Sequence, residues 1–97
     1  IESFASKETE MIFKGIVSKK LPTNIQKTAR RKLLYLDEAD SLCDLAAPLE
    51  NRFEALHGDR EGQHSIRIND QWRICFTWAN SKAKDVEIIN YRNNLAF

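Results

Sequence analysis

Two arginines in one predicted β-hairpin are the side chains best suited to bind an anion. Arg67 and Arg73 belong to the stretch from Gly62 to Phe76, in which polar and apolar residues alternate. A guanidinium group offers a planar fork of N–H donors that matches phosphate oxygens. Like charges opposite each other in a sheet are destabilising, so we expect an anionic ligand or a carboxylate beside each arginine. For Arg73 the structural alternative is an ion pair with Glu87 or Asp85.

The expected register of this hairpin explains why the two arginines meet. Every second residue on both strands is apolar, which is typical of half-buried strands: Ile66, Ile68, Trp72, Ile74, Phe76 and Trp78. A three-residue loop of Asn69 to Gln71 places Arg67 opposite Arg73. The same register places Ile66 opposite Ile74, so that each face keeps one kind of side chain.

Two helices are expected before the hairpin. Ser6 is suited to cap the first helix, which ends near Ser18 and buries a stripe of apolar residues. Thr23 and Gln26 have the spacing of a capping box at the start of the second helix, which runs to about Glu38. The two expected buried stripes are Ile12, Phe13, Ile16 and Val17 in the first helix, and Ile25, Ala29, Leu33 and Leu36 in the second.

The remaining segments complete one predicted domain, residues 1–97. Ile1 to Phe4, Arg52 to Leu56 and Asp85 to Tyr91 are expected strands, and Asn93 to Phe97 is a short tail. Leucines at 42, 45 and 49 are expected to pack an irregular segment onto the core. This order predicts an α+β fold, in which an N-terminal strand and two helices pack on one face of a mostly antiparallel sheet.

Composition and charge exclude several classes of protein. The chain has 15 basic and 14 acidic residues, but seven basic residues and no acidic one fall between Lys14 and Leu36. This basic layer is either a solvated helix face or an electrostatic footprint for phosphates or an acidic partner. No apolar run is long enough to span a membrane. Free thiols at Cys43 and Cys75 and the lack of a secretory signal pattern predict a cytoplasmic protein.

Three segments resemble the HigB toxins of the RelE superfamily, and within them the GraT-like branch. These segments are Asn51 to Gly58, Gly62 to Phe76 and Val86 to Tyr91, and the resemblance covers almost the whole chain. Its most specific part is Asn69-Asp70-Gln71-Trp72-Arg73. The resemblance implies a RelE-like fold and the toxin of a bacterial type II toxin–antitoxin module.

The resemblance also implies an activity and its partners. The implied activity is ribosome-dependent cleavage of mRNA in the ribosomal A site, without a metal or cofactor, which inhibits translation and growth. The implied partners are the 70S ribosome, mRNA and a HigA-type helix-turn-helix antitoxin, with operon DNA bound only through the antitoxin. No zinc spacing, glycine-rich phosphate loop or Ser-His-Asp set is present.

Cutting RNA through its 2′-hydroxyl needs a base, an acid and cations that stabilise the phosphorane, each contributing on the order of 10²- to 10⁴-fold. By resemblance, Arg73 supplies charge, and Tyr91 stacks on a base or orients the phosphate. His57 is a candidate for proton transfer, since histidine titrates near neutral pH. Glu54 is either a base or a partner for Arg52 or Arg73, with the partner role favoured. Strand alternation places the side chain of His64 on the core face.

The chain departs from the family pattern at its end. Asn90-Tyr91-Arg92 stands where the family has Asp-Tyr-His. Asparagine and arginine cannot exchange protons at neutral pH, so Arg92 could act by charge alone, and proton transfer falls to His57, Glu54 or Tyr91. Glu54 and Asp59 are the carboxylates expected near His57. The residues expected to contact RNA are Arg52, Arg60 and Arg67, with Lys27, Arg30 and Arg31 on the second helix.

A second function remains open from the sequence. The departures at Asn90 and Arg92 favour a non-nucleolytic binding module, either a gyrase-directed toxin of the ParE kind or a degenerate toxin that binds ribosome or antitoxin. Arg73, His57 and Tyr91 favour the nuclease.

Overall fold

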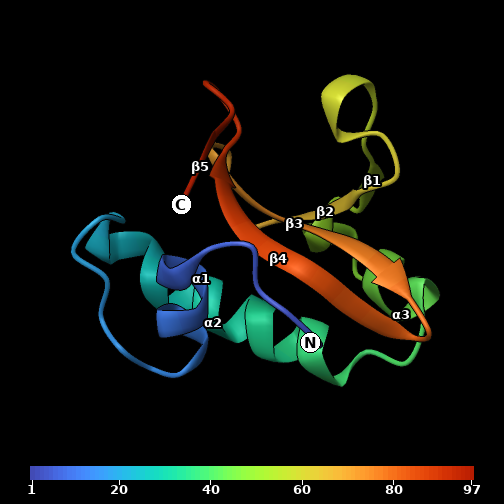
Figure 1. Ribbon diagram of the computed structural model, residues 1–97, viewed down its shortest axis with the longest axis horizontal. Helices are drawn as coiled ribbons and strands as arrows, with labels where there is room; N and C mark the ends of the chain where they lie inside the picture. The colour runs from blue at the N-terminus through green and yellow to red at the C-terminus, as the bar shows by residue number, and fades with distance from the viewer.

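A five-stranded antiparallel sheet with strand order β1-β2-β3-β4-β5 is the centre of the fold (Figure 1). The computed structural model describes residues 1–97. The helices are α1 (Lys7–Phe13), α2 (Thr23–Glu38) and α3 (Leu42–Ala46), with short 3-10 turns η1 (Leu49–Asn51) and η2 (Gly58–Arg60). The strands are β1 (Glu54–Ala55), β2 (His64–Arg67), β3 (Trp72–Ala79), β4 (Lys82–Asn90) and β5 (Leu95–Ala96). The predicted α+β class is confirmed.

The register predicted for the central hairpin is correct. Arg67 lies opposite Arg73 and Ile66 opposite Ile74. The loop between them is held by Asn69, whose Oδ1 accepts hydrogen bonds from the backbone N–H groups of Gln71 and Trp72 at 2.8 and 2.9 Å. Such asparagine side chains replace backbone partners in tight turns, which explains how a three-residue loop is held closed.

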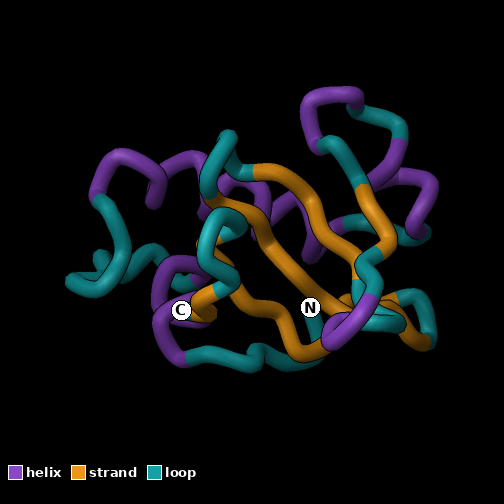
Figure 2. The backbone as a smooth tube through the Cα atoms, turned by 90° about the horizontal axis from the view of Figure 1, so that it is seen from above, coloured by secondary structure: helices purple, strands orange, loops and turns teal.

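The main core lies between the sheet and helices α1 and α2. Figure 1 shows both helices on one side of β4, and Figure 2 shows the strands side by side as a twisted layer. Ile25, Ala29, Leu33 and Leu36 of α2 are buried as predicted. They pack in one cluster with Ile66, Ile74, Phe76, Val86 and Ile88 of the sheet. No helix in the structure is both long and apolar enough to cross a bilayer.

The first helix is shorter than predicted. Ser6 caps it as expected by accepting a hydrogen bond from the Thr9 N–H at 3.1 Å. The helix ends at Phe13, and Gly15 follows with a φ of 83°, a left-handed conformation that glycine adopts readily. Because the chain turns away there, Ile16 and Val17 are 51% and 69% exposed, and their predicted burial is wrong.

The second helix begins at Thr23, but the predicted capping box is wrong. Pro22 is the residue before the helix, and no side chain caps it. The Gln26 side chain turns instead to the preceding loop, accepting from the Ser18 N–H at 2.9 Å and donating to the Leu21 carbonyl at 2.9 Å. Gln26 therefore ties the loop to the helix, which orders the chain between α1 and α2.

The strand limits differ from the prediction at both ends of the sheet. Ile1 to Phe4 makes only one isolated parallel bridge, between Phe4 and Val86. The last long strand begins at Lys82 rather than Asp85, because Asn80 and Ser81 form a two-residue turn with φ of 54° and 62°, which suits a tight hairpin.

Two further details depart from the prediction. The expected tail contributes the short strand β5, which pairs with β4. Leu45 is fully buried as expected, but Leu49 is 90% exposed. The prediction that all three leucines of this segment pack onto the core is wrong for Leu49.

Candidate active site

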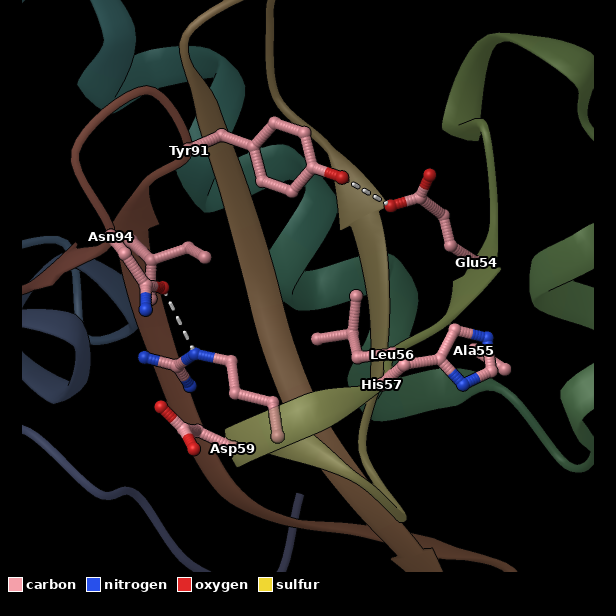
Figure 3. A pocket seen from close by; sticks show the side chains of 9 residues that line it. Glu54, Ala55, Leu56, His57, Asp59, Tyr91 and Asn94 are labelled. Atoms are coloured by element: carbon pink, nitrogen blue, oxygen red, sulfur yellow. Dashed lines mark hydrogen bonds between the residues drawn. The ribbon is translucent and has the colours of Figure 1, made fainter.

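A pocket of about 570 Å³ lies on the face of β4 that carries Ile89. Ile88 belongs to the core beneath the helices, and successive strand residues point to opposite faces, so this pocket is on the far side of the sheet from α1 and α2. One wall is formed by residues 54–60 and the other by the end of β4 and the turn after it (Figure 3). Its polar lining residues are Glu54, His57, Asp59, Arg60, Tyr91 and Asn94.

A hydrogen bond between Tyr91 and Glu54 crosses this pocket. The Tyr91 hydroxyl donates to Glu54 Oε1 at 2.7 Å (Figure 3). This bond to a carboxylate, with partial desolvation as the second cause, raises the pKa of Tyr91 above its ordinary value. Tyr91 is therefore a protonated donor at neutral pH. Glu54 forms no ion pair with Arg52 or Arg73, the partners favoured from the sequence: its hydrogen-bonded partner is Tyr91, and its charge acts on Arg73 only at longer range.

Arg73 lies beneath the Tyr91 ring, with Cζ 5.3 Å from the ring centre. It is buried, and it donates from Nε to Ser65 Oγ at 2.8 Å and from Nη2 to the Arg52 carbonyl. Burial lowers the pKa of Arg73, and the Glu54 charge opposes that effect. The suggested ion pair with Glu87 or Asp85 is not formed, because Glu87 pairs with Arg60.

One nitrogen of Arg73 is left to act on a ligand. Nη1 has no hydrogen-bond partner within the chain. His64 Nδ1 is the only side-chain nitrogen or oxygen that is both buried and without a hydrogen-bond partner, so Arg73 Nη1 is not fully buried. It follows that Nη1 reaches solvent. Ser65, which the sequence reasoning did not single out, fixes the other side of the guanidinium from the neighbouring strand.

The other arginine of the hairpin has a carboxylate of its own. Arg67 forms an ion pair with Asp70 in the loop. The hydrogen bond from Arg67 lowers the pKa of Asp70. The repulsion expected between Arg67 and Arg73 is thus offset for Arg67 by an acidic residue, as one of the two alternatives predicted. Arg52, whose side chain is exposed, contributes its backbone carbonyl to Arg73.

His57 lies at the open rim of the pocket. Its side chain is 84% exposed, and Nδ1 is 3.5 Å from the carboxylate of Glu61, which is 75% exposed. The structure places Glu61 here, where Glu54 or Asp59 was expected. The other histidine, His64, is half-buried between Phe53 and Phe76 at ring-centre distances of 5.4 and 6.1 Å. It turns toward the core as predicted, but its buried Nδ1 has no hydrogen-bond partner.

The two residues that depart from the family pattern have different surroundings. Asn90 is buried, and its Oδ1 accepts from the backbone N–H of Arg92 at 3.1 Å. Its side chain therefore holds the turn that follows β4 and carries Tyr91. The side chain of Arg92 is exposed beyond that turn. Asn90 is therefore an uncharged, buried residue with a structural contact, whereas the charge of Arg92 is accessible to solvent and ligands.

The basic residues of α2 do not join this pocket. Lys27, Arg30 and Arg31 line a separate hollow of about 550 Å³ with Leu34 and Tyr35. Helix α2 packs on the core face of the sheet through its buried stripe, so this hollow faces away from the active-site candidate. No group of three or more His, Cys, Asp or Glu side chains is placed to hold a metal ion.

Comparison with known protein families identifies the chain. A family model described as the RelE-like toxin of the type II toxin–antitoxin system HigB matches residues 2–91. The chain belongs to the HigB-like toxins. Its antiparallel sheet with helices on one face is thus a RelE-like toxin fold, and a type II toxin acts with an antitoxin as its partner.

Curated relatives agree with the family. Toxin HigB-1 of Vibrio cholerae serotype O1 is 43% identical over 63 residues, which are 65% of this chain and 66% of that protein. Endoribonuclease HigB of Proteus vulgaris is 30% identical over 93 residues, or 96% of this chain and 97% of that protein. An uncharacterized protein of Haemophilus influenzae is 28% identical over 81 residues, or 84% and 80% of the two chains.

Proposed function

We propose that this HigB-like toxin is an endoribonuclease that cuts mRNA in the ribosomal A site and thereby inhibits translation and growth. The observation that carries the proposal is that Glu54, Tyr91 and Arg73 lie together: the Tyr91–Glu54 bond joins the two walls of the pocket, and Arg73 lies beneath the Tyr91 ring. This arrangement provides a carboxylate, an aromatic ring and a fixed cation within a few ångströms. The relative from Proteus vulgaris is named Endoribonuclease HigB, which favours this function over the gyrase-directed alternative.

Glu54 is the residue best suited to act as the general base. The alternative is Tyr91, but its hydroxyl carries its proton at neutral pH because the bond to Glu54 raises its pKa. A carboxylate accepts protons and cannot donate them when ionised. Glu54 therefore takes the proton of the 2′-hydroxyl, while Tyr91 orients the carboxylate and offers its half-exposed ring to an unpaired base.

The reaction also needs a cation that stabilises the phosphorane and a general acid, and Arg73 and His57 supply them. The 2′-oxygen attacks phosphorus, the bond to the 5′-oxygen breaks, and negative charge builds on the phosphorane. Arg73 is held rigidly by Ser65 and Arg52 with Nη1 free, so its charge is in place before the reaction begins. His57, at the rim, gives a proton to the departing 5′-oxygen. Arg92, exposed in the turn next to Tyr91, adds a further positive charge.

The family and the charged surface support a set of proposed partners. The toxin binds the 70S ribosome and mRNA, and a HigA-type helix-turn-helix antitoxin neutralises it and alone contacts operon DNA. The exposed cations of α2 meet ribosomal RNA or the antitoxin, while Arg52 and Arg67 approach the mRNA backbone. The toxin acts in the cytoplasm as one domain of residues 1–97, with no metal or cofactor in the reaction.

Primer extension on mRNA tests the proposal. Purified toxin is added to mRNA with and without programmed ribosomes, in buffer containing a metal chelator. We expect cuts at defined positions only when ribosomes are present, and no effect of the chelator. A toxin that leaves ribosome-bound mRNA intact but blocks gyrase supercoiling would overturn the proposed function.

A further inference from the structure

We infer that Arg60 is a positioning residue that fixes the two walls of the pocket relative to each other, and is not itself an RNA ligand. The inference deepens the proposed function and rests on it for its catalytic consequence. Arg60 was expected from the sequence to contact RNA. In the structure its Nε and Nη1 donate to three partners, one of which, Asn94, lines the opposite wall of the pocket, and only Nη2 has no partner within the chain.

The contacts of Arg60 cross from one wall to the other. Nη1 donates to Glu87 Oε1 on β4 at 2.8 Å and to Gln63 Oε1 at 3.0 Å. Nε donates to Asn94 Oδ1 at 3.2 Å, in the turn that follows Tyr91. Figure 3 shows this last bond joining the loop of Asp59 to the turn of Asn94. One side chain thus links the η2 loop, β4 and the turn after β4.

The partners of Arg60 show why this link is strong. The side chains of Arg60 and Glu87 are only 18% and 16% exposed, whereas the other side-chain ion pairs include partners that are 46% to 86% exposed. Partly buried charge pairs are screened less by solvent than exposed ones. Breaking one by removing a single partner leaves the other charge desolvated and unpaired.

The link governs the catalytic groups because each wall carries some of them. The η2 loop starts directly after His57, and its turn closes through the Arg60 N–H to the His57 carbonyl at 3.3 Å. The opposite wall carries Tyr91, bonded to Glu54. A displacement of about 1 Å in such a site can reduce a rate by about 10²-fold. Arg60 therefore determines how far His57, in the wall of residues 54–60, lies from Tyr91 in the opposite wall.

Glu87→Gln separates positioning from RNA binding because the two roles predict opposite effects. If Arg60 binds phosphate, removing the Glu87 charge releases the cation and strengthens RNA binding. If Arg60 is a positioning residue, Glu87→Gln loosens the same link as Arg60→Gln and lowers kcat in the same way. Glu2→Gln is the matched control: it removes a carboxylate from the exposed pair with Lys84 at 3.0 Å, outside the pocket.

The experiment has a structural arm and a kinetic arm, both on the full chain. Amide hydrogen exchange measures the η2 turn through the N–H groups of Arg60, Glu61 and Gln63, all hydrogen-bonded within that turn. We expect exchange there to be about tenfold faster in both Arg60→Gln and Glu87→Gln, and unchanged in Glu2→Gln. Unchanged exchange in both pocket variants would overturn the inference, whether or not the toxin cuts RNA.

The kinetic arm uses steady-state cutting of mRNA on programmed ribosomes with limiting toxin, which gives kcat and KM separately. We expect kcat to fall by about tenfold in both variants, while KM and the salt dependence of binding stay at wild-type values. Arg60→Lys, which keeps one cation for Glu87 but not the fork, should fall between wild type and Arg60→Gln. A higher KM in Arg60→Gln with a lower one in Glu87→Gln would instead identify Arg60 as an RNA ligand. A wild-type toxin that does not cut would refute the proposed function alone, because the exchange arm still decides the position of the loop.

Discussion

Glu54→Gln is the substitution that tests the proposed chemistry most directly. Glutamine has nearly the same shape as glutamate, and its amide oxygen can still accept the Tyr91 hydroxyl that now donates to Glu54 Oε1 at 2.7 Å. An amide, however, cannot take a proton at neutral pH. The variant therefore removes the base while keeping the geometry of the pocket.

The expected magnitudes separate catalysis from stability. Losing a general base lowers the rate by about 10²- to 10⁴-fold, which corresponds to roughly 3 to 5 kcal/mol in the activation free energy. The hydrogen bond changes from a charge-assisted bond to a neutral one, which reduces the free energy of unfolding by about 1 kcal/mol. The folded state is thus kept while cutting is nearly lost.

Single-turnover cutting with saturating toxin on programmed ribosomes measures the effect on the chemical step. Glu10→Gln is the control, because Glu10 pairs with Lys14 at 3.4 Å on the exposed side of α1, outside the pocket, and we expect it to cut as wild type does. Wild-type cutting by Glu54→Gln would refute the assignment of the base.

Tyr91→Phe completes this test. It keeps the ring that lies over Arg73 and removes only the hydroxyl, leaving Glu54 unoriented but ionised. We expect it to lower the rate by about tenfold, less than Glu54→Gln does. If Tyr91→Phe were as slow as Glu54→Gln and no slower in combination with it, the two groups would act as one unit, and the proton would pass through the tyrosine hydroxyl.

Three further predictions concern Arg73, Lys32 and α2. Arg73→Lys keeps the charge but loses the fork, so we expect cutting to fall by about 10²-fold; Arg73→Ala should also lower the free energy of unfolding by about 3 kcal/mol in urea titrations, because Ser65 and the Arg52 carbonyl lose their donor. Burial lowers the pKa of Lys32 below its ordinary 10.5. The free-energy cost of burying the charged ammonium group is therefore full at low pH, and it is relieved as pH rises through the lowered pKa toward 10.5. The free energy of unfolding should accordingly rise with pH more steeply in wild type than in Lys32→Met. Reversing Lys27, Arg30 and Arg31 to Glu should weaken ribosome binding and flatten its salt dependence, and binding that is unchanged at low and high salt would mean that this face is only solvated.

Local patterns in the sequence determined the sheet register and the core. Alternation with period two placed Ile66 opposite Ile74 and Arg67 opposite Arg73, because a slip of one residue would turn every apolar side chain to the wrong face. Helical spacing identified the four buried apolar residues of α2, whereas the burial of Lys32 in the same helix was not predicted. Burial of a periodic stripe depends on neighbours within a few positions, which the sequence displays directly.

Local patterns failed where a distant segment competed for the same group. Gln26 has the spacing of a capping box with Thr23, but its side chain bonds Ser18 and Leu21 of the preceding loop. Ile16 and Val17 continue the apolar stripe of the first helix, but the left-handed Gly15 turns the chain away before they can be buried. Sequence spacing indicates which contacts a side chain can reach, whereas the packing of the whole chain determines which of these contacts forms.

The partners inside the candidate site were decided by the tertiary structure alone. Glu54 and Tyr91 are 37 residues apart, and Arg60 and Glu87 are 27 apart. Sequence reasoning offered several oppositely charged neighbours for each group: it favoured Arg52 or Arg73 as the partner of Glu54, and it gave Glu87 or Asp85 only as the structural alternative for Arg73. Hydrogen bonds and ion pairs depend on distances of a few ångströms, and these are set only when the η2 loop, β3 and β4 meet in space. The residue types needed for the chemistry were therefore visible in the sequence, but their pairing came from the fold.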